Sequence, residues 1–193
     1  MKNKIGIFGG TFNPIHIGHT AMANAFIEKL SLDLLYVIPN NIPPLKESHG
    51  VSGMDRLEMV KIAFSGNDKV CASDIELRRE GMSYTRDTVA QIKALHPESE
   101  LYLLMGDDWI DRFDEWKDFR FILDTATLVV AYRGEKDISG SLERIYSLSG
   151  KRPMLLGNER IKVSSTEYRE RPNCNDLPEG VYEYIIKRGL YSK

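Results

Sequence analysis

Short runs of apolar residues alternate along this chain with segments whose apolar residues recur every three or four positions. Apolar runs of four to eight residues are typical of buried strands, and the wider spacing is typical of amphipathic helices. We predict strands at residues 5–8, 34–38, 70–77, 101–105, 127–131 and 154–156. We predict helices through residues 22–30, 54–64 and 84–95, one or two short helices at 109–123, and helices near 141–148, 166 and 181.

Strands and helices therefore alternate over the whole chain. This order predicts an α/β fold with a doubly wound parallel sheet, because parallel strands are joined by right-handed helical crossovers. Ligands of such sheets lie outside the carboxyl ends of the strands, so the residues that follow each strand are candidates for function. No repeat, low-complexity tract or linker stands out, and we predict a single domain over residues 1–193.

Composition and charge narrow the class of protein. The chain has 193 residues, 26 basic and 28 acidic, with a net charge of −2. This balance argues against a nucleic acid or a membrane surface as the main partner. Cys71 and Cys174 form no CxxC pair, which disfavours a cysteine zinc site. No segment has about 18 consecutive apolar residues, and the first apolar run is too short for a signal peptide, so we expect a cytoplasmic protein.

The stretch GGTFNPIHIGHT, residues 9–20, directly follows the first predicted strand. Its two leading glycines allow a sharp turn and a close approach to a ligand. It contains neither GxGxxG nor GxxxxGK[ST], which excludes the dinucleotide fingerprint and the Walker loop. The next helix begins either at Asn13-Pro14 or later, near Gly18. In both cases His16 and His19 lie about one turn apart beside a helix N-terminus, where free N–H groups favour anions.

Three interpretations of this stretch are open. In a phosphate cradle, the two imidazoles would donate hydrogen bonds to phosphate oxygens and offset the charge that grows in a transition state. In a plain strand-to-helix turn, the histidines would be surface or core residues. A metal pair would need a third ligand, and none follows at a recognisable spacing. Thr11, Gly18 and the HxxH spacing together favour the phosphate cradle.

This stretch resembles the signature of the HIGH-motif nucleotidyltransferases, a superfamily that includes the ATP site of class I aminoacyl-tRNA synthetases. The motif is spelled literally at residues 16–19. The resemblance implies a Rossmann-like nucleotidyltransferase fold with C-terminal helices. It implies that His16 and His19 contact the ATP phosphates and stabilise the leaving pyrophosphate. It also implies ATP binding by the turn itself, at Gly9, Gly10, Thr11 and Phe12.

A second stretch, VSSTEYR at residues 163–169, resembles the second ATP motif of the superfamily, ISSTxIR. Ser164 and Glu167 form a capping box, so a helix start is expected there whatever the function. Arg169 lies one turn further along the same side of that helix. The resemblance implies that Arg169 contacts the triphosphate and that the three hydroxyl residues bind ATP: Ser164, Ser165 and Thr166.

Further stretches resemble the bacterial nicotinate mononucleotide adenylyltransferases. NNIPPLK at residues 40–46 is similar to the NxxPPHK loop of that family, SYT at 83–85 to its motif for the pyridine carboxylate, and GDD at 106–108 to its GxD. Each alone has an ordinary explanation as a turn, a rigid loop or a core aromatic, yet all follow successive predicted strands. The resemblance covers essentially the whole chain. It implies mononucleotide binding by Asn40, Lys46, Tyr84, Thr85, Asp108 and a ring-stacking Trp116, and nucleotide contact by Arg133.

The reaction implied is transfer of the adenylyl group of ATP to nicotinate mononucleotide, giving nicotinate adenine dinucleotide and pyrophosphate in NAD biosynthesis. The attacking phosphate oxygen is already anionic, so no general base is needed, and catalysis depends on positioning and charge stabilisation. We expect Mg²⁺ held mainly by ATP phosphates, with no protein metal site. Whether the acid is preferred over the amide, and whether the chain forms a homodimer, stay open.

Two residues depart from the family pattern. Asn13 replaces the aspartate of GGTFDP, which removes a possible metal ligand but keeps the capping and turn-forming ability of that residue. Leu45 replaces the histidine of PPHK. Three rival functions share part of this pattern. A phosphopantetheine adenylyltransferase shares the first loop but lacks SYT and the aligned tryptophan. A class I synthetase needs an anticodon-binding region, for which there is no room, and a nucleotide-binding regulator would have lost catalysis.

Overall fold

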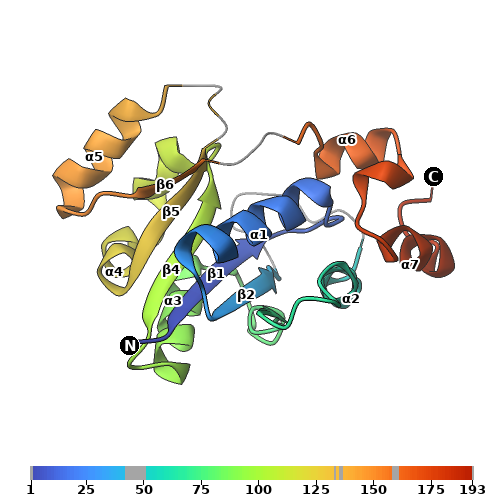
Figure 1. Ribbon diagram of the computed structural model, residues 1–193, viewed down its shortest axis with the longest axis horizontal. Helices are drawn as coiled ribbons and strands as arrows, with labels where there is room; N and C mark the ends of the chain where they lie inside the picture. The colour runs from blue at the N-terminus through green and yellow to red at the C-terminus, as the bar shows by residue number, and fades with distance from the viewer. Residues whose placement is uncertain (1, 42–50, 133, 135–136, 158–160, 193) are drawn as a thin grey trace.

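A six-stranded parallel sheet forms the centre of the computed structural model (Figure 1), which describes residues 2–41, 51–132, 134, 137–157 and 161–192. The strands lie in the order β3-β2-β1-β4-β5-β6, and every neighbouring pair is parallel. This order confirms the doubly wound α/β fold. The strands are β1 (Lys4–Gly10), β2 (Leu34–Pro39), β3 (Val70–Ala72), β4 (Glu100–Gly106), β5 (Ala126–Tyr132) and β6 (Met154–Gly157).

Helices cover both faces of the sheet. The described helices are α1 (Ile17–Leu30), α2 (Gly53–Ala63), α3 (Thr85–Leu95), α4 (Phe119–Thr125), α5 (Ser139–Ser149), α6 (Ser165–Glu170) and α7 (Val181–Arg188), with the short 3-10 helices η1 (Ile110–Glu115) and η2 (Cys174–Asp176). One core packs α1, α2, α6 and α7 against the sheet, and the other packs α3, η1, α4 and α5. The side chains of β1 alternate between them, because successive residues of a strand point to opposite faces: Ile7 belongs to the second core and Phe8 to the first.

The segment predicted as a strand at residues 70–77 is the main correction to the predicted elements. Only Val70–Ala72 forms a strand, at the edge of the sheet next to β2. The chain then turns, and the N–H of Arg78 donates to the carbonyl of Asp74 at 3.0 Å. The strand was predicted too long because the apolar alternation extends to Ile75. This residue lies in the turn after β3 and is nevertheless buried, with 9% of its surface exposed. The segment 109–123 forms two short helices, as predicted, whereas η2 was not predicted.

The chain reverses its direction of winding between β1 and β4, which lie side by side at the middle of the sheet. Crossovers from such a pair leave on opposite faces, and a crevice opens at the carboxyl ends of the strands. β1 ends at Gly10 and β4 at Gly106, while Gly10 pairs with Pro39 of β2. The loops that follow β1, β2 and β4 therefore meet at one edge of the sheet.

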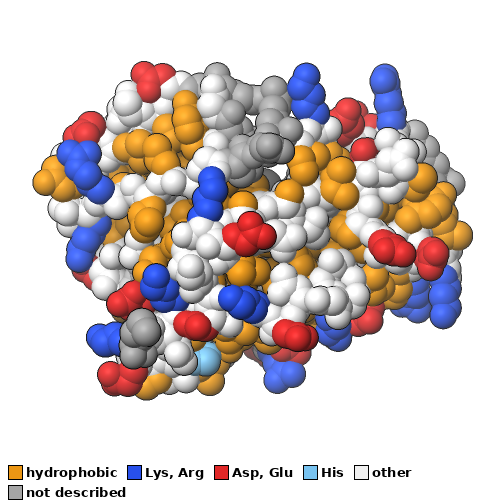
Figure 2. All heavy atoms as spheres, viewed as in Figure 1, with side chains coloured by type: hydrophobic (Ala, Val, Ile, Leu, Met, Phe, Trp, Pro, Cys, Tyr) orange, Lys and Arg blue, Asp and Glu red, His pale blue; other side chains and the backbone are white. Residues whose placement is uncertain are grey.

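The surface agrees with the balanced composition. On the face shown in Figure 2, basic and acidic side chains are interspersed with apolar ones, and neither sign forms a continuous region. Within the described ranges no helix is both long and apolar enough to cross a membrane.

Candidate active site

The loop after β1 is a tight turn anchored in the core. Phe12 has a φ of 48° and is buried, and its ring lies 5.3 Å from that of Phe8 and 5.1 Å from that of His19. A Cβ at position 10 would lie 2.8 Å from Cζ of Phe12, so any residue other than glycine there would force this buried ring to shift. The helix that follows has His16 as its N-cap and begins at Ile17. The later of the two predicted helix starts is therefore right, and Asn13 is not the N-cap.

His16 and His19 lie face to face at the start of α1. Their ring centroids are 3.6 Å apart and their planes are inclined by 23°. The backbone N–H of His16 donates to Nδ1 of His19 at 3.2 Å. Since Nδ1 of His19 accepts this bond, the ring proton of His19 resides on Nε2. His19 is therefore oriented to offer one N–H donor.

His16 is buried more deeply than His19, with 7% of its surface exposed. Its Nδ1 is buried and has no hydrogen-bond partner among the residues that the structure describes. Burial disfavours the charged ring and lowers the pKa of His16 from 6.5 to about 4. At neutral pH His16 is thus uncharged, so it can donate a hydrogen bond to an anion but adds no positive charge.

The free energy of unfolding is expected to fall as the pH is lowered from about 6.5 towards about 4, because the unfolded chain protonates His16 while the folded chain does not. The stability that comes from keeping His16 neutral is fully present above pH 6.5. It amounts to about 3 kcal/mol and is lost as the pH falls through the folded pKa of about 4. Urea denaturation at several pH values measures it. The control is His16→Asn, which caps a helix but does not titrate. An equal pH dependence in wild type and control would contradict the assignment.

The two predicted ATP motifs contact each other in the fold, although the residues that make the contact are 151 positions apart in the sequence. The hydroxyl of Ser165 donates to the carbonyl of Pro14 at 2.8 Å, and Nη1 of Arg169 donates to the carbonyl of Asn13 at 2.7 Å. Nη2 of Arg169 donates to Oγ1 of Thr166 at 3.1 Å. Ser164 caps α6 by accepting the N–H of Glu167, which confirms the predicted helix start. The start of α6 thus lies against the loop after β1.

Asn13 connects this loop to the last residues of the chain. It is buried, and its Oδ1 accepts the hydroxyl of Tyr191 at 2.6 Å. Burial also raises the pKa of Tyr191, which therefore keeps the proton that it donates. An amide oxygen accepts this bond as a carboxylate would, so the departure from the family aspartate preserves the anchor of the loop.

The loop after β2 joins the first loop to the SYT segment. The N–H of Asn40 donates to the carbonyl of Gly10 at 2.9 Å, and its Nδ2 donates to Oγ1 of Thr11 at 3.3 Å. The N–H of Asn41 donates to Oγ of Ser83 at 2.9 Å. Asn40 therefore lies beside the predicted ATP loop. Lys46, Leu45 and Arg133 lie outside the described residues.

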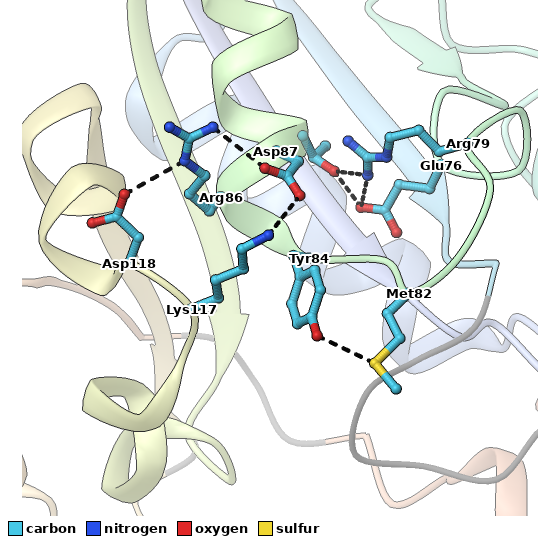
Figure 3. A network of polar contacts seen from close by, with 9 residues as sticks. Glu76, Arg79, Met82, Tyr84, Arg86, Asp87, Lys117 and Asp118 are labelled. Carbon is cyan, nitrogen blue, oxygen red and sulfur yellow. Dashed lines mark hydrogen bonds and ion pairs between the residues drawn. The ribbon is translucent and has the colours of Figure 1, made fainter.

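The SYT segment forms the start of α3, as predicted. Tyr84 is the N-cap and Thr85 the first helical residue. Figure 3 shows Lys117 reaching over Tyr84, with Nζ 4.3 Å from the centroid of the ring and 3.4 Å from Asp87. Trp116 is half-buried, and its ring centroid lies 5.3 Å from that of Phe113. The Lys117 contact thus brings the segment that carries Trp116 against the start of α3.

A buried carboxylate that sequence reasoning missed supports this start. Glu76 accepts the hydroxyl of Thr88 at 2.6 Å, and Nη2 of Arg79 donates to the same hydroxyl oxygen at 2.7 Å (Figure 3). Burial raises the pKa of Glu76, while its hydrogen bonds to Thr88 and Ser83 oppose that shift. The sequence did not indicate this role of Glu76, because the residue lies in the segment that was predicted to be a strand. The spacing of three residues between Glu76 and Arg79 is the feature of the sequence that could have indicated an interaction between them.

Asp108 follows β4 at the point where the winding reverses. It is exposed, and its carboxylate folds back over Gly106, whereas the neighbouring Asp107 is buried. Of the two acids, Asp108 is the one accessible from solvent, in keeping with its predicted place in the site. The predicted site residues that the structure describes lie at the end of β1, in the turn into α1 and in its first turn, after β2 and β4, or at the starts of α3 and α6. Trp116 is joined to this group through Lys117 and Tyr84.

Comparison with known proteins shows the family to which this chain is similar. The model of the cytidylyltransferase-like family matches residues 7–171. A protein of Geobacillus thermodenitrificans named "Probable nicotinate-nucleotide adenylyltransferase" is 37% identical over 97% of this chain and 86% of its own length. A protein of the same name from Dictyoglomus thermophilum is 38% identical over 97% of this chain and 99% of its own length.

Solved structures are similar in fold. The nicotinic acid mononucleotide adenylyltransferase of Plasmodium falciparum, complexed with APC, superposes with a TM-score of 0.78 at 22% identity, over 98% of this chain and 97% of that chain. The same enzyme complexed with NaAD gives a TM-score of 0.76 at 24% identity, with the same coverage. At these identities the likeness concerns the fold alone.

Proposed function

This chain belongs to the cytidylyltransferase-like family and, within it, to the nicotinate-nucleotide adenylyltransferases, and we infer that it transfers the adenylyl group of ATP to nicotinate mononucleotide. The products are nicotinate adenine dinucleotide and pyrophosphate. The observation that carries this function is the junction of the two ATP motifs, in which Ser165 and Arg169 bind the backbone of Pro14 and Asn13, in the loop that leads to the two histidines. The reaction is a step of NAD biosynthesis.

In the reaction, a phosphate oxygen of the mononucleotide forms a bond to the α-phosphorus of ATP, and the bond to the pyrophosphate oxygen breaks. The attacking oxygen needs no base, because it is anionic at neutral pH. The protein's task is to align the two substrates and to stabilise the charge that moves to the leaving group. We assign this second task to the N–H groups of His16 and His19 and to the guanidinium of Arg169.

The remaining ATP contacts are assigned to the backbone of two turns. The hydroxyl proton of Ser165 is already donated to Pro14, and a hydroxyl has only one proton to donate. The hydroxyl of Ser164 accepts the N–H of Glu167. Ser165 therefore fixes the position of α6, whereas Ser164 still has its own proton to donate to a phosphate oxygen. The other phosphate contacts are assigned to nearby N–H groups, including those at Gly9, Gly10, Thr11, Phe12 and Thr166.

The mononucleotide is assigned to the side of the site near α3. The N–H groups around Tyr84 and Thr85 lie at a helix start, which favours a pyridine carboxylate. The ring of Trp116 is assigned to stack on the pyridine, and Asn40 and Asp108 are assigned to the part of the site between the pyridine and ATP. Lys46 and Arg133 keep their proposed roles on the basis of the motif alone.

We propose that Mg²⁺ enters the site with ATP. Mg²⁺ is commonly held by phosphate oxygens and water with few protein ligands. In the part of the chain that the structure describes, no group of three or more His, Cys, Asp or Glu side chains could hold a metal ion. Residue 13 is an amide, and its oxygen already accepts the hydroxyl of Tyr191. The ion would supply countercharge to the phosphates.

A pyrophosphate-release assay with Mg-ATP tests the function. Nicotinate mononucleotide, nicotinamide mononucleotide and phosphopantetheine are offered in parallel, and we expect the highest kcat/KM with nicotinate mononucleotide. Turnover of phosphopantetheine alone would instead identify the rival adenylyltransferase. An absence of turnover with all three, in a folded protein that binds ATP, would indicate a nucleotide-binding regulator.

A further inference from the structure

Arg56, in the first turn of α2, ties together the loops that follow β1 and β2. Its Nη1 donates to the carbonyl of Thr11 at 2.7 Å, and its Nη2 donates to the carbonyl of Asn40 at 2.7 Å. Thr11 and Asn40 also share the direct side-chain bond of 3.3 Å. One planar guanidinium thus spans the backbones of two loops, one assigned to ATP and the other to the mononucleotide.

The position is unfavourable for an arginine that serves stability alone. Arg56 is 5% exposed, and in the described part of the chain it forms no ion pair with a carboxylate. The adjacent Asp55 instead binds Tyr184 and Arg188. Burying an unpaired charge is costly, and a cation at a helix N-terminus opposes the helix dipole. Burial accordingly lowers the pKa of Arg56.

These costs are understandable if the bidentate geometry is itself needed. The two N–H groups of a guanidinium fork leave in fixed directions, so they hold two acceptors at a set separation, which the single ammonium of lysine does not. The positive charge of Arg56 also lies within one hydrogen bond of Thr11, which belongs to the loop assigned to ATP. A neutral side chain of the same size would fill the space without either property.

We propose that Arg56 is a positioning residue for adenylyl transfer, which holds the loop after β1 and the loop after β2 at the separation that aligns the two substrates. The proposal rests on the function inferred above. Arg56 acts through Thr11 and Asn40, and its loss disturbs the alignment of the substrates more than the binding of either one. It therefore affects kcat, while the separate affinities for ATP and for the mononucleotide change little.

The test compares Arg56→Met and Arg56→Lys with wild type. Lys61→Met is the matched control, because it removes an exposed cation from the same helix, where Lys61 pairs only with Glu58 among the described residues. Steady-state kinetics give kcat, calorimetric titration gives Kd for each substrate alone, and thermal melts report folding. Hydrogen exchange of peptides that cover residues 9–12 and 40–41 reports the mobility of the loops independently of any activity.

We expect Arg56→Met to lower kcat by about 10²-fold, the cost of a misplacement on the order of 1 Å, with both Kd values close to wild type. Arg56→Lys should recover part of this loss, since it keeps the charge and one contact. Exchange in both loops should be faster in Arg56→Met than in Lys61→Met.

Two kinetic results would overturn the proposal: a kcat of Arg56→Met equal to that of Lys61→Met, or a weakened Kd for one substrate with kcat intact, which would make Arg56 a binding residue. If Arg56→Met does not fold, Arg56→Lys decides, and a wild-type kcat in that variant is contrary to the proposal. If wild type turns over no substrate, the inferred function fails, and unchanged loop exchange in Arg56→Lys would separately exclude the positioning role.

Discussion

Replacing His19 by alanine is expected to lower kcat by roughly 10²-fold or more, which corresponds to about 2.7 kcal/mol of transition-state stabilisation. The reason is the fixed direction of its ring. Nδ1 accepts the N–H of His16, which fixes the orientation of the ring and leaves Nε2 as the nitrogen that carries the proton. A donor that is already oriented needs no rearrangement when charge moves to the leaving pyrophosphate.

The measurement is kcat at saturating Mg-ATP and nicotinate mononucleotide, with thermal melts to verify folding. His96→Ala is a suitable control, because it removes a histidine from the C-terminal end of α3. There His96 contacts the hydroxyl of Tyr36 at 2.9 Å, at the opposite end of that helix from Tyr84 and Thr85. Its kcat should equal that of wild type. An unchanged kcat in a folded His19→Ala protein would refute the assignment of His19.

Trp116→Ala is expected to raise KM for the mononucleotide roughly tenfold while KM for ATP stays near wild type, because stacking of a base on an aromatic ring is worth about 1–3 kcal/mol. Trp116 suits this role since its ring is half-buried and is carried by the segment that Lys117 brings against Tyr84. Trp116→Phe keeps an aromatic face and should recover most of the affinity. A rise in KM for ATP alone would show that the two halves of the site are wrongly divided.

Fluorescence provides an independent measurement of the same prediction. The chain has two tryptophans, Trp109 and Trp116, so Trp109→Phe leaves Trp116 as the single reporter. We expect nicotinate mononucleotide to change the emission of Trp109→Phe in a saturable way. The same titration of Trp116→Phe should change the remaining signal far less, and equal responses would exclude stacking on Trp116.

Most of the fold was predictable from the pattern of apolar residues. The runs that became β1, β2, β4 and β5 are continuous because both faces of these strands are covered, and such runs are readable without tertiary contacts. The edge strand β3 was predicted too long, because the apolar residue at position 75 is buried from a turn. Local pattern does not distinguish burial in a turn from burial in a short strand.

For the first loop, the sequence predicted which residue types take part, but it did not predict their protonation states. The sequence alone determined a glycine turn with two histidines one turn apart, the helix start at Ser164 and the pattern of loops after successive strands. It did not determine that His16 is uncharged, because the pKa of an imidazole depends on how deeply the fold buries it. Nor did it indicate which nitrogen of His19 carries the proton.

Long-range contacts were decided only by the tertiary structure. Arg56 lies among the polar residues of a helix, and nothing local marks it as the bridge between Thr11 and Asn40. The role of Asn13 depends on Tyr191, from the other end of the chain, which donates its hydroxyl to Oδ1 of Asn13. Periodicity and capping are properties of neighbours in sequence. The partner of a buried polar group is set by which loops the sheet brings together, so these roles could be read only from the folded molecule.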